Sequence, residues 1–119
     1  MENLTIAEYP ANDYYSSASQ LISKLEGATH TLLVNSGIPA IATILATLWP
    51  HSKVIVQEDY YSGTRHMIEK MFKDRICYLP VKAQDHLQQI ESFLASQGDN
   101  ISMILLETPS NPLLLVYDI

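Results

Sequence analysis

The chain has 119 residues, and its 13 acidic and 7 basic residues give it a formal net charge of −6. A sequence of this length forms one domain, and an acidic sequence without a Lys/Arg cluster is not expected to bind nucleic acid, because no positive field attracts phosphodiesters. The acidic start Met1-Glu2-Asn3, with no apolar run after it, is not expected to be a signal peptide, and no apolar run is long enough to span a membrane. The single cysteine, Cys77, cannot form an internal disulfide and is expected to be a small buried hydrophobic residue. These features predict a cytoplasmic protein.

The N-terminal part of the sequence predicts two helices with an apolar strand between them. Gly27 ends the first helix, and Trp49-Pro50 stops the second. The strand is apolar on both faces, which is typical of parallel sheets that are covered on both sides. In chain order we predict a lead-in over residues 1–13, a helix over 14–27, a strand over 30–35 and a helix over 37–49.

The rest of the sequence alternates between strands and helices. Pro80 closes the middle one of three strands, Asp85 caps the last helix, and residues 98–100 form a turn. Such alternation predicts an α/β fold with a mostly parallel sheet and flanking helices. The predicted elements are strands over 54–56, 75–79 and 103–106 and helices over 64–73 and 86–97.

Three polar loops follow predicted strands, at residues 35–37, 58–64 and 107–112. Ligands of parallel sheets gather beyond the carboxyl ends of the strands, so the three loops can converge on one edge. The first loop runs through Ser36 and Gly37 into a helix, whose free N–H groups and dipole suit a phosphate. Gly37 would let that phosphate approach the backbone without a Cβ in the way. On these residues alone, a plain strand–helix turn is the alternative.

Four stretches of the sequence carry a resemblance to a known family. They are Leu25-Glu26-Gly27-Ala28, Asn35-Ser36-Gly37-Ile38, Asp59-Tyr60-Tyr61-Ser62-Gly63-Thr64 and Glu107-Thr108-Pro109-Ser110-Asn111-Pro112. Through them the chain, from about Gln20 to Ile119, resembles the Cys/Met-metabolism (transsulfuration) enzymes that use pyridoxal 5'-phosphate (PLP). The resemblance implies that residues 14–119 are the N-terminal part of the PLP-binding large domain of a fold type I enzyme. It also implies elimination or replacement at the β or γ carbon of amino acids such as cystathionine, methionine or O-acyl-homoserine.

The resemblance implies a role for five residues in cofactor binding. The backbone N–H groups of Gly37 and Ile38 would hold the phosphate, in the turn that Ser36 opens. The ring of Tyr61 would stack on the pyridine ring, where a flat aromatic face orients the cofactor and excludes water. The amide of Asn111 would contact the ring hydroxyl. The role of Glu107, at the same strand end, stays open.

Each of these residues also has a simpler interpretation. Tyr61 could be a surface aromatic, Asn111 a turn residue between two prolines, and Ser36 a helix cap. The 4 histidines and the single cysteine show no metal-ligand spacing, so no metal is expected.

The sequence departs from the family pattern in two places. The family's Tyr-x-Arg, which reaches the phosphate of a neighbouring subunit, aligns with Ala7 and Tyr9, so that contact is not expected here. In the family, the lysine that forms the Schiff base with PLP directly follows a Ser-x-Thr motif. No lysine of this sequence follows such a motif; the five are Lys24, Lys53, Lys70, Lys73 and Lys82. We therefore expect an N-terminal fragment without catalytic residues of its own. The alternative is a non-catalytic remnant that self-associates or binds a full-length homologue.

The family's sheet topology has a consequence for a chain that supplies only its first four strands. The third, second and fourth strands would pair in that order, and the first, residues 30–35, would lose its neighbour. An apolar strand with an unpaired backbone tends to associate. We expect it to repack against the small sheet, to form a homo-oligomer or to be completed by another chain.

Overall fold

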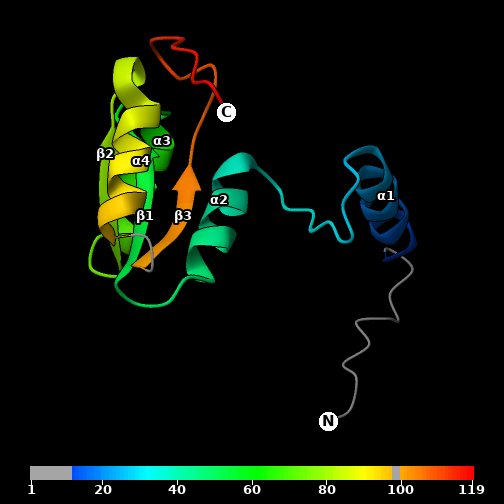
Figure 1. Ribbon diagram of the computed structural model, residues 1–119. Helices are drawn as coiled ribbons and strands as arrows, with labels where there is room; N and C mark the ends of the chain where they lie inside the picture. The colour runs from blue at the N-terminus through cyan, green and yellow to red at the C-terminus, as the bar shows by residue number, and fades with distance from the viewer. Residues whose placement is uncertain (1–11, 98–99) are drawn as a thin grey trace. The chain divides into compact units, whose positions relative to one another are not determined.

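The computed structural model describes residues 12–97 and 100–119, and the chain divides into two compact units, residues 1–37 and 38–119. Figure 1 labels the elements in chain order. They are α1 (Asn12–Leu25), α2 (Gly37–Ala46), β1 (Ser52–Gln57), α3 (Ser62–Met67), the π-helical turn η1 (Ile68–Phe72), β2 (Ile76–Val81), the 3-10 turn η2 (Ala83–Asp85), α4 (His86–Gln97) and β3 (Ile101–Leu105). None of the described helices has the length and apolar character needed to cross a membrane.

Helix α1 of the first unit ends where the sequence predicts. Gly27 has a φ of 63°, and the N–H of Ala28 donates to the carbonyl oxygen of Ser23 over 2.8 Å. Glycine reaches this left-handed conformation without the steric cost of a Cβ, and the hydrogen bond satisfies a carbonyl at the helix end. The helix begins at Asn12, so most of the predicted lead-in, residues 1–11, lies outside the described residues.

The predicted strand at residues 30–35 is wrong. None of these residues belongs to a strand, and the sheet consists of β1, β2 and β3. Leu32, which was expected to be buried, is 71% exposed. A strand exists only through hydrogen bonds to a neighbour, and the described residues supply no neighbour to this segment. The segment is therefore not a strand of the small sheet, and its expected association with another copy or another chain stays a prediction.

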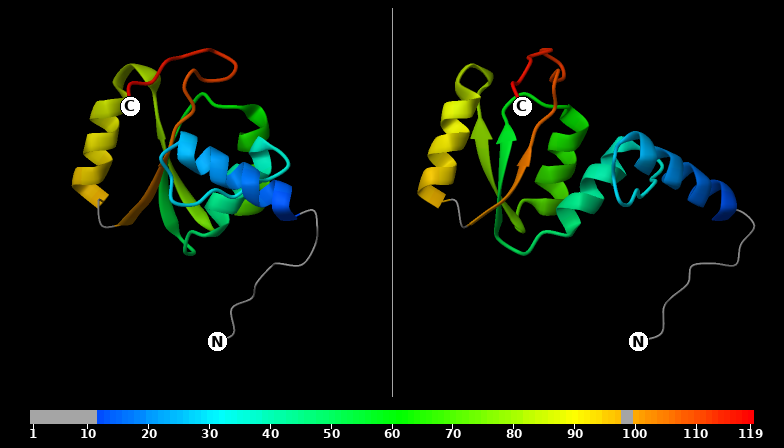
Figure 2. Two further views of the ribbon diagram at one scale, coloured as in Figure 1. Left: turned by 90° about the vertical axis from the view of Figure 1, so that its right-hand side faces the viewer. Right: turned by 45° about the vertical axis from the view of Figure 1, so that its right-hand side comes forward.

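The sheet of the second unit has the order β2-β1-β3, and both pairs are parallel, as the family topology predicts. Parallel neighbours need crossover connections. The segment with α3 and η1 joins β1 to β2, and α4 joins β2 to β3. Figures 1 and 2 show α4 on one face of the sheet and α2 and α3 on the other. This covering on both faces explains why the central strand β1 is almost fully buried and has the apolar residues Val54, Ile55 and Val56 at its centre.

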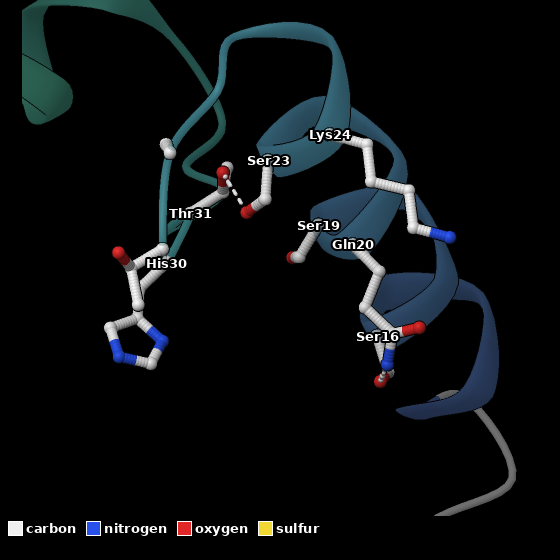
Figure 3. Close-up of a pocket in the computed structure, with 9 residues that line it drawn as sticks. Ser16, Ser19, Gln20, Ser23, Lys24, His30 and Thr31 are labelled. Atoms are coloured by element: carbon white, nitrogen blue, oxygen red, sulfur yellow. Dashed lines mark hydrogen bonds between the residues drawn. The ribbon is translucent and has the colours of Figure 1, made fainter.

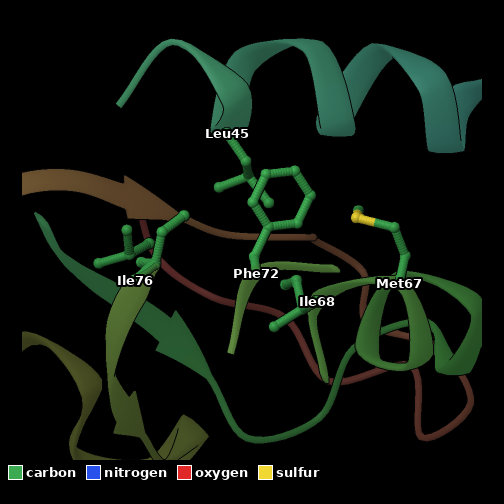
Figure 4. Packing of buried hydrophobic residues seen from close by; sticks show 6 residues of the cluster. Leu45, Met67, Ile68, Phe72 and Ile76 are labelled. Carbon is green, nitrogen blue, oxygen red and sulfur yellow. The ribbon is translucent and has the colours of Figure 1, made fainter. Parts of the chain in front are cut away.

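The core of the second unit lies between β1 and the helices α2, α3 and η1. Figure 4 shows Leu45 of α2 facing the ring of Phe72 and the side chains beside it. The cluster consists of Leu45, Val54, Met67, Ile68, Phe72 and Ile76, each at most 6% exposed. Burial of this apolar surface fixes α2 and α3 against the sheet, and therefore fixes the loops that lead into them.

Two further expectations about β2 are wrong. Pro80 does not close the strand, which continues to Val81 with Pro80 in register with Val56. An edge strand tolerates proline because its missing N–H can face away from the sheet. Cys77 is exposed rather than buried. Side chains alternate along a strand, and the buried Ile76 occupies the core face.

Candidate functional site

Two of the three predicted loops meet beyond the carboxyl ends of β1 and β3. The hydroxyl of Ser110 donates to the Asp59 carboxylate, and the N–H of Leu113 donates to the same Oδ2 over 3.2 Å. Asp59 follows β1, whereas Ser110 and Leu113 follow β3. The structure thus confirms that the second and third loops converge. Ser36 and Gly37 close the first unit, so only these two loops are tested.

The side chain of Gln57 forms hydrogen bonds to both loops from the end of β1. It is fully buried at the last position of β1. Its Nε2 donates to the carbonyl oxygen of Glu107 over 2.8 Å and to that of Asp59, and its Oε1 accepts from the N–H of Glu107 over 2.5 Å. Both amide protons and the amide oxygen are therefore used.

Tyr61 lies at the start of α3 and is held by Glu107. Its backbone N–H donates to Glu107 Oε2 over 3.3 Å, and its side chain is 45% exposed. The ring passes close to Gly63, where an added Cβ would lie 2.9 Å from the ring Cζ. The structure thus gives Glu107, whose role the sequence left open, a place in fixing the Tyr61 loop.

The loop after β3 is closed by its own hydrogen bonds. The N–H of Ser110 donates to the carbonyl oxygen of Leu115 over 2.8 Å, and the N–H of Leu115 donates to Ser110 Oγ over 3.0 Å. The N–H of Tyr117 donates to Thr108 Oγ1 over 3.0 Å. These bonds leave Asn111 exposed in the turn at the tip of the loop. Its amide is therefore free of the loop's internal bonding and open to a ligand.

Arg65 supplies positive charge beside these acidic loops. Its guanidinium donates to the carbonyl of Glu58 and lies 4.6 Å from the centre of the Tyr60 ring. Burial raises the pKa of Tyr60 above its usual value, and the charge of Arg65 opposes this shift. A mostly apolar cavity of about 220 Å³ adjoins the site, lined by Ile41, Val56, Tyr60, Thr64, Leu105, Leu106 and Glu107.

Helix α2 begins at Gly37, where the sequence predicts the start of a helix. An added Cβ at Gly37 would meet nothing within 4 Å, so the backbone there is open to a ligand. The side chain of Ile38 packs against the core cluster and anchors the first turn of the helix. Ser36 precedes the helix and is exposed. The N–H groups of a first helical turn have no partner within the helix, so they are available to an anion.

The first unit contains a separate polar pocket of about 400 Å³ between α1 and residues 28–31. Figure 3 shows Ser19 and Ser23 on the side that faces Thr31, whose hydroxyl lies 2.7 Å from that of Ser23. Lys24 and His30 also line this pocket. The sheet edge remains the candidate site, because there two polar loops that follow parallel strands meet. Within residues 12–97 and 100–119, no group of three or more His, Cys, Asp or Glu could hold a metal ion.

Comparison with known proteins decides the family. The family described as "Cys/Met metabolism PLP-dependent enzyme" matches residues 11–119. The chain belongs to this family.

Two curated relatives show how much of a family member the chain represents. It is 33% identical over 120 residues to cystathionine beta-lyase MetC of Bacillus subtilis, with 94% of the chain and 30% of that protein covered. It is 29% identical over 109 residues to the chloroplastic mimosinase of Leucaena leucocephala, with 92% of the chain and 24% of that protein covered. The chain therefore spans about a quarter to a third of the length of these Cys/Met-metabolism enzymes.

A solved structure gives the same result for the fold. The crystal structure of cystathionine gamma-lyase from Lactobacillus plantarum, complexed with L-serine, superposes with a TM-score of 0.81 at 28% identity. The match covers 98% of this chain and 30% of that one. The α/β architecture with its three-stranded parallel sheet is thus part of the fold of the Cys/Met-metabolism enzymes.

Sequence reasoning missed two residues that build this site. Gln57 and Ser110 are both fully buried, and the side chain of each forms a hydrogen bond to the opposite loop. The sequence does indicate a structural role for Gln57. A polar amide directly after Val54-Ile55-Val56 needs hydrogen-bond partners if the strand is buried. Which groups those partners are could come only from the structure.

Proposed function

We propose that this chain supplies one wall of the PLP pocket of a transsulfuration enzyme. The reaction class would be β or γ elimination or replacement on sulfur- or oxygen-substituted amino acids. The observation that carries the proposal is the joining of the Tyr61 loop to the Asn111 loop through Gln57, Glu107 and the Asp59–Ser110 bond. Membership of the family supports the proposal, since the Tyr61 loop and the Asn111 loop carry the motifs that resemble the family's cofactor motifs.

The N-terminus of α2 would bind the phosphate of PLP. The open backbone at Gly37 fits a ligand that approaches the N–H groups of Gly37 and Ile38 directly. Ser36 would add its hydroxyl at the mouth of this turn. The helix needs no cationic side chain here, because its free N–H groups and dipole supply the positive potential.

Tyr61 and Asn111 would orient the ring of the cofactor. The half-exposed ring of Tyr61 offers a flat face for stacking, and the exposed amide of Asn111 can donate to an oxygen without exchanging a proton. PLP, when bound, supplies an electron sink for the bonds of the amino-acid substrate. The residues of this chain would bind it, orient it and shield one face from water.

The covalent role would fall to a lysine outside this sequence. None of the five lysines present follows a Ser-x-Thr motif. An amine held against the cofactor's aldehyde carbon is needed for covalent catalysis. We therefore propose that residues 1–119 alone are inactive and act together with further chain or a partner chain, in the cytoplasm.

A chimera tests the proposal. This chain replaces the matching segment of the Bacillus subtilis cystathionine beta-lyase, and PLP absorbance and cystathionine cleavage are measured. Bound PLP together with activity is the expected result, and the same chimera with Tyr61→Ala should lose affinity for PLP. A chimera that is folded by circular dichroism yet binds no PLP would overturn the proposal. So would a borohydride-reducible adduct on one lysine of residues 1–119 alone, which would place the covalent role inside this chain.

A second candidate is a non-catalytic remnant that associates with itself or with a full-length homologue. The observation that favours it is the exposed apolar segment around Leu32, which belongs to no strand. Exposed apolar segments of this kind promote association. Under this alternative, Leu32→Asp should shift the chain toward monomer in analytical ultracentrifugation, whereas Gln88→Asp on the exposed surface of α4 should not.

A further inference from the structure

The side chain of Gln57 reaches the backbone of both loops of the candidate site. It ends β1, so its backbone leads into the Asp59–Tyr61 loop. Its amide contacts the backbone of Glu107, which opens the loop that carries Asn111. The two residues are 50 positions apart in the chain.

The geometry of the amide resembles one more step of sheet pairing. The Gln57 Oε1 accepts from the N–H of Glu107 over 2.5 Å, and its Nε2 donates to the carbonyl of the same residue over 2.8 Å. Strand β3 ends at Leu105, two residues earlier, so the side chain extends the pairing of β1 with β3 into the loops. The second amide proton goes to the carbonyl of Asp59.

We propose that Gln57 is a positioning residue that sets the spacing between the Tyr61 loop and the Asn111 loop. A methionine-sized apolar group would fill the same space but would leave the Glu107 N–H and two carbonyls without partners. Buried backbone groups without partners are costly, so the loops would separate to reach water. Loss of the amide would therefore loosen the site while the strand that carries it stays packed. The cofactor part of this inference rests on the proposed function.

Hydrogen exchange of the unliganded chain tests the inference without any cofactor. For each amide, the exchange rate in Gln57→Met is divided by the rate in wild type. This ratio should be at least about tenfold larger for Glu107 than for Ile55, because only the Glu107 amide loses its acceptor. The matched control is Val54→Ala, a fully buried position in the same strand. It should accelerate both amides by a similar factor.

A second variant keeps the test valid if Gln57→Met fails to fold. Gln57→Glu, when ionised, retains an acceptor for the Glu107 N–H but has no proton to donate to the two carbonyls. It should protect the Glu107 amide while the Tyr61 amide exchanges faster. Equal acceleration of the Glu107 and Ile55 amides in Gln57→Met, or of the Tyr61 and Ile55 amides in Gln57→Glu, would overturn the inference.

The PLP readout separates this inference from the proposed function. In the chimera, Gln57→Met should weaken PLP binding by at least about tenfold, and Val54→Ala should leave the affinity within about twofold. If the parent chimera binds no PLP, the proposed function fails and the exchange experiment still decides the role of Gln57. If PLP binds equally to parent and Gln57→Met, Gln57 does not position the site.

Discussion

The Nε2 of His86 lies 3.0 Å from the backbone carbonyl oxygen of Asp118, which ties the start of α4 to the C-terminal segment. Its Nδ1 lies 2.9 Å from the carbonyl oxygen of Ala83. A neutral imidazole has only one N–H, so both nitrogens can donate only when the ring is protonated. The carbonyl of Asp118 and then that of Ala83 raise the pKa of His86, while burial opposes them. The imidazole and the Tyr117 ring also pack in a T-shaped arrangement, with 5.1 Å between their centroids.

His86 should make stability depend on pH. Its pKa in the folded state is raised above the usual 6.5, so its stabilisation is complete below that value and is lost as the pH rises through the folded-state pKa. The free energy of unfolding in urea should therefore fall over this range. His86→Leu is the control, and the difference between wild type and variant isolates His86 from the other histidines. A difference that stays constant with pH would contradict the charged state inferred here.

Gly63→Ala should move the ring of Tyr61 without destabilising the chain. A Cβ at this position would lie 2.9 Å from the ring Cζ and 3.2 Å from Cδ1, so the ring must rotate away. Alanine also favours a helix over glycine by about 0.5–1 kcal/mol, which offsets the displacement. The ring proton shifts of Tyr61 by NMR should change, and the free energy of unfolding should not fall. The neighbouring Ser62→Ala should leave the ring shifts as they are; unchanged shifts in Gly63→Ala would show that the ring does not use this space.

Ser110→Ala should destabilise the loop after β3. The hydroxyl is fully buried, donates to the Asp59 carboxylate and accepts from the N–H of Leu115 over 3.0 Å. Its removal leaves the Leu115 N–H without its acceptor and takes one of two donors from the Asp59 carboxylate, and should lower the free energy of unfolding by about 2 kcal/mol. Urea denaturation checks this value, with the exposed Ser92→Ala as control.

A double-mutant cycle can isolate the hydrogen bond between Ser110 and the Asp59 carboxylate. Asp59→Ala and Ser110→Ala should be less costly together than the sum of the two single changes, because each removes the same interaction. Strict additivity in urea denaturation would indicate that the two side chains do not interact in solution.

Asn111→Ala should leave stability unchanged and weaken only the binding of PLP. Asn111 is exposed at the tip of a loop that Ser110 and Thr108 hold closed. Surface changes of this kind usually alter the free energy of unfolding by at most about 0.5 kcal/mol. Thermal unfolding of the chain and PLP titration of the chimera give the two readings. A loss of stability with unchanged PLP affinity would make Asn111 a turn residue only.

The sequence by itself determined the elements that depend on local pattern. Periodic apolar residues and their breakers place helices and strands near their observed bounds, as for α4 and the end of α1 at Gly27. The motif after β3 identified the family, and the family implied the order β2-β1-β3. These features follow from residues that are neighbours in the chain or from motifs that are read as a unit.

Only the tertiary structure decided the features that need a distant partner. Residues 30–35 have an apolar pattern suited to a strand, but backbone hydrogen bonds to a neighbour make a strand, and the described residues supply none. Cys77 is exposed because its side chain lies on the face of β2 opposite to the buried Ile76. The amide of Gln57 forms hydrogen bonds to the backbone of Glu107, 50 residues away, because parallel pairing brings the ends of β1 and β3 together. A side chain's hydrogen bonds across such a separation are set by strand order and register, which the local sequence does not encode.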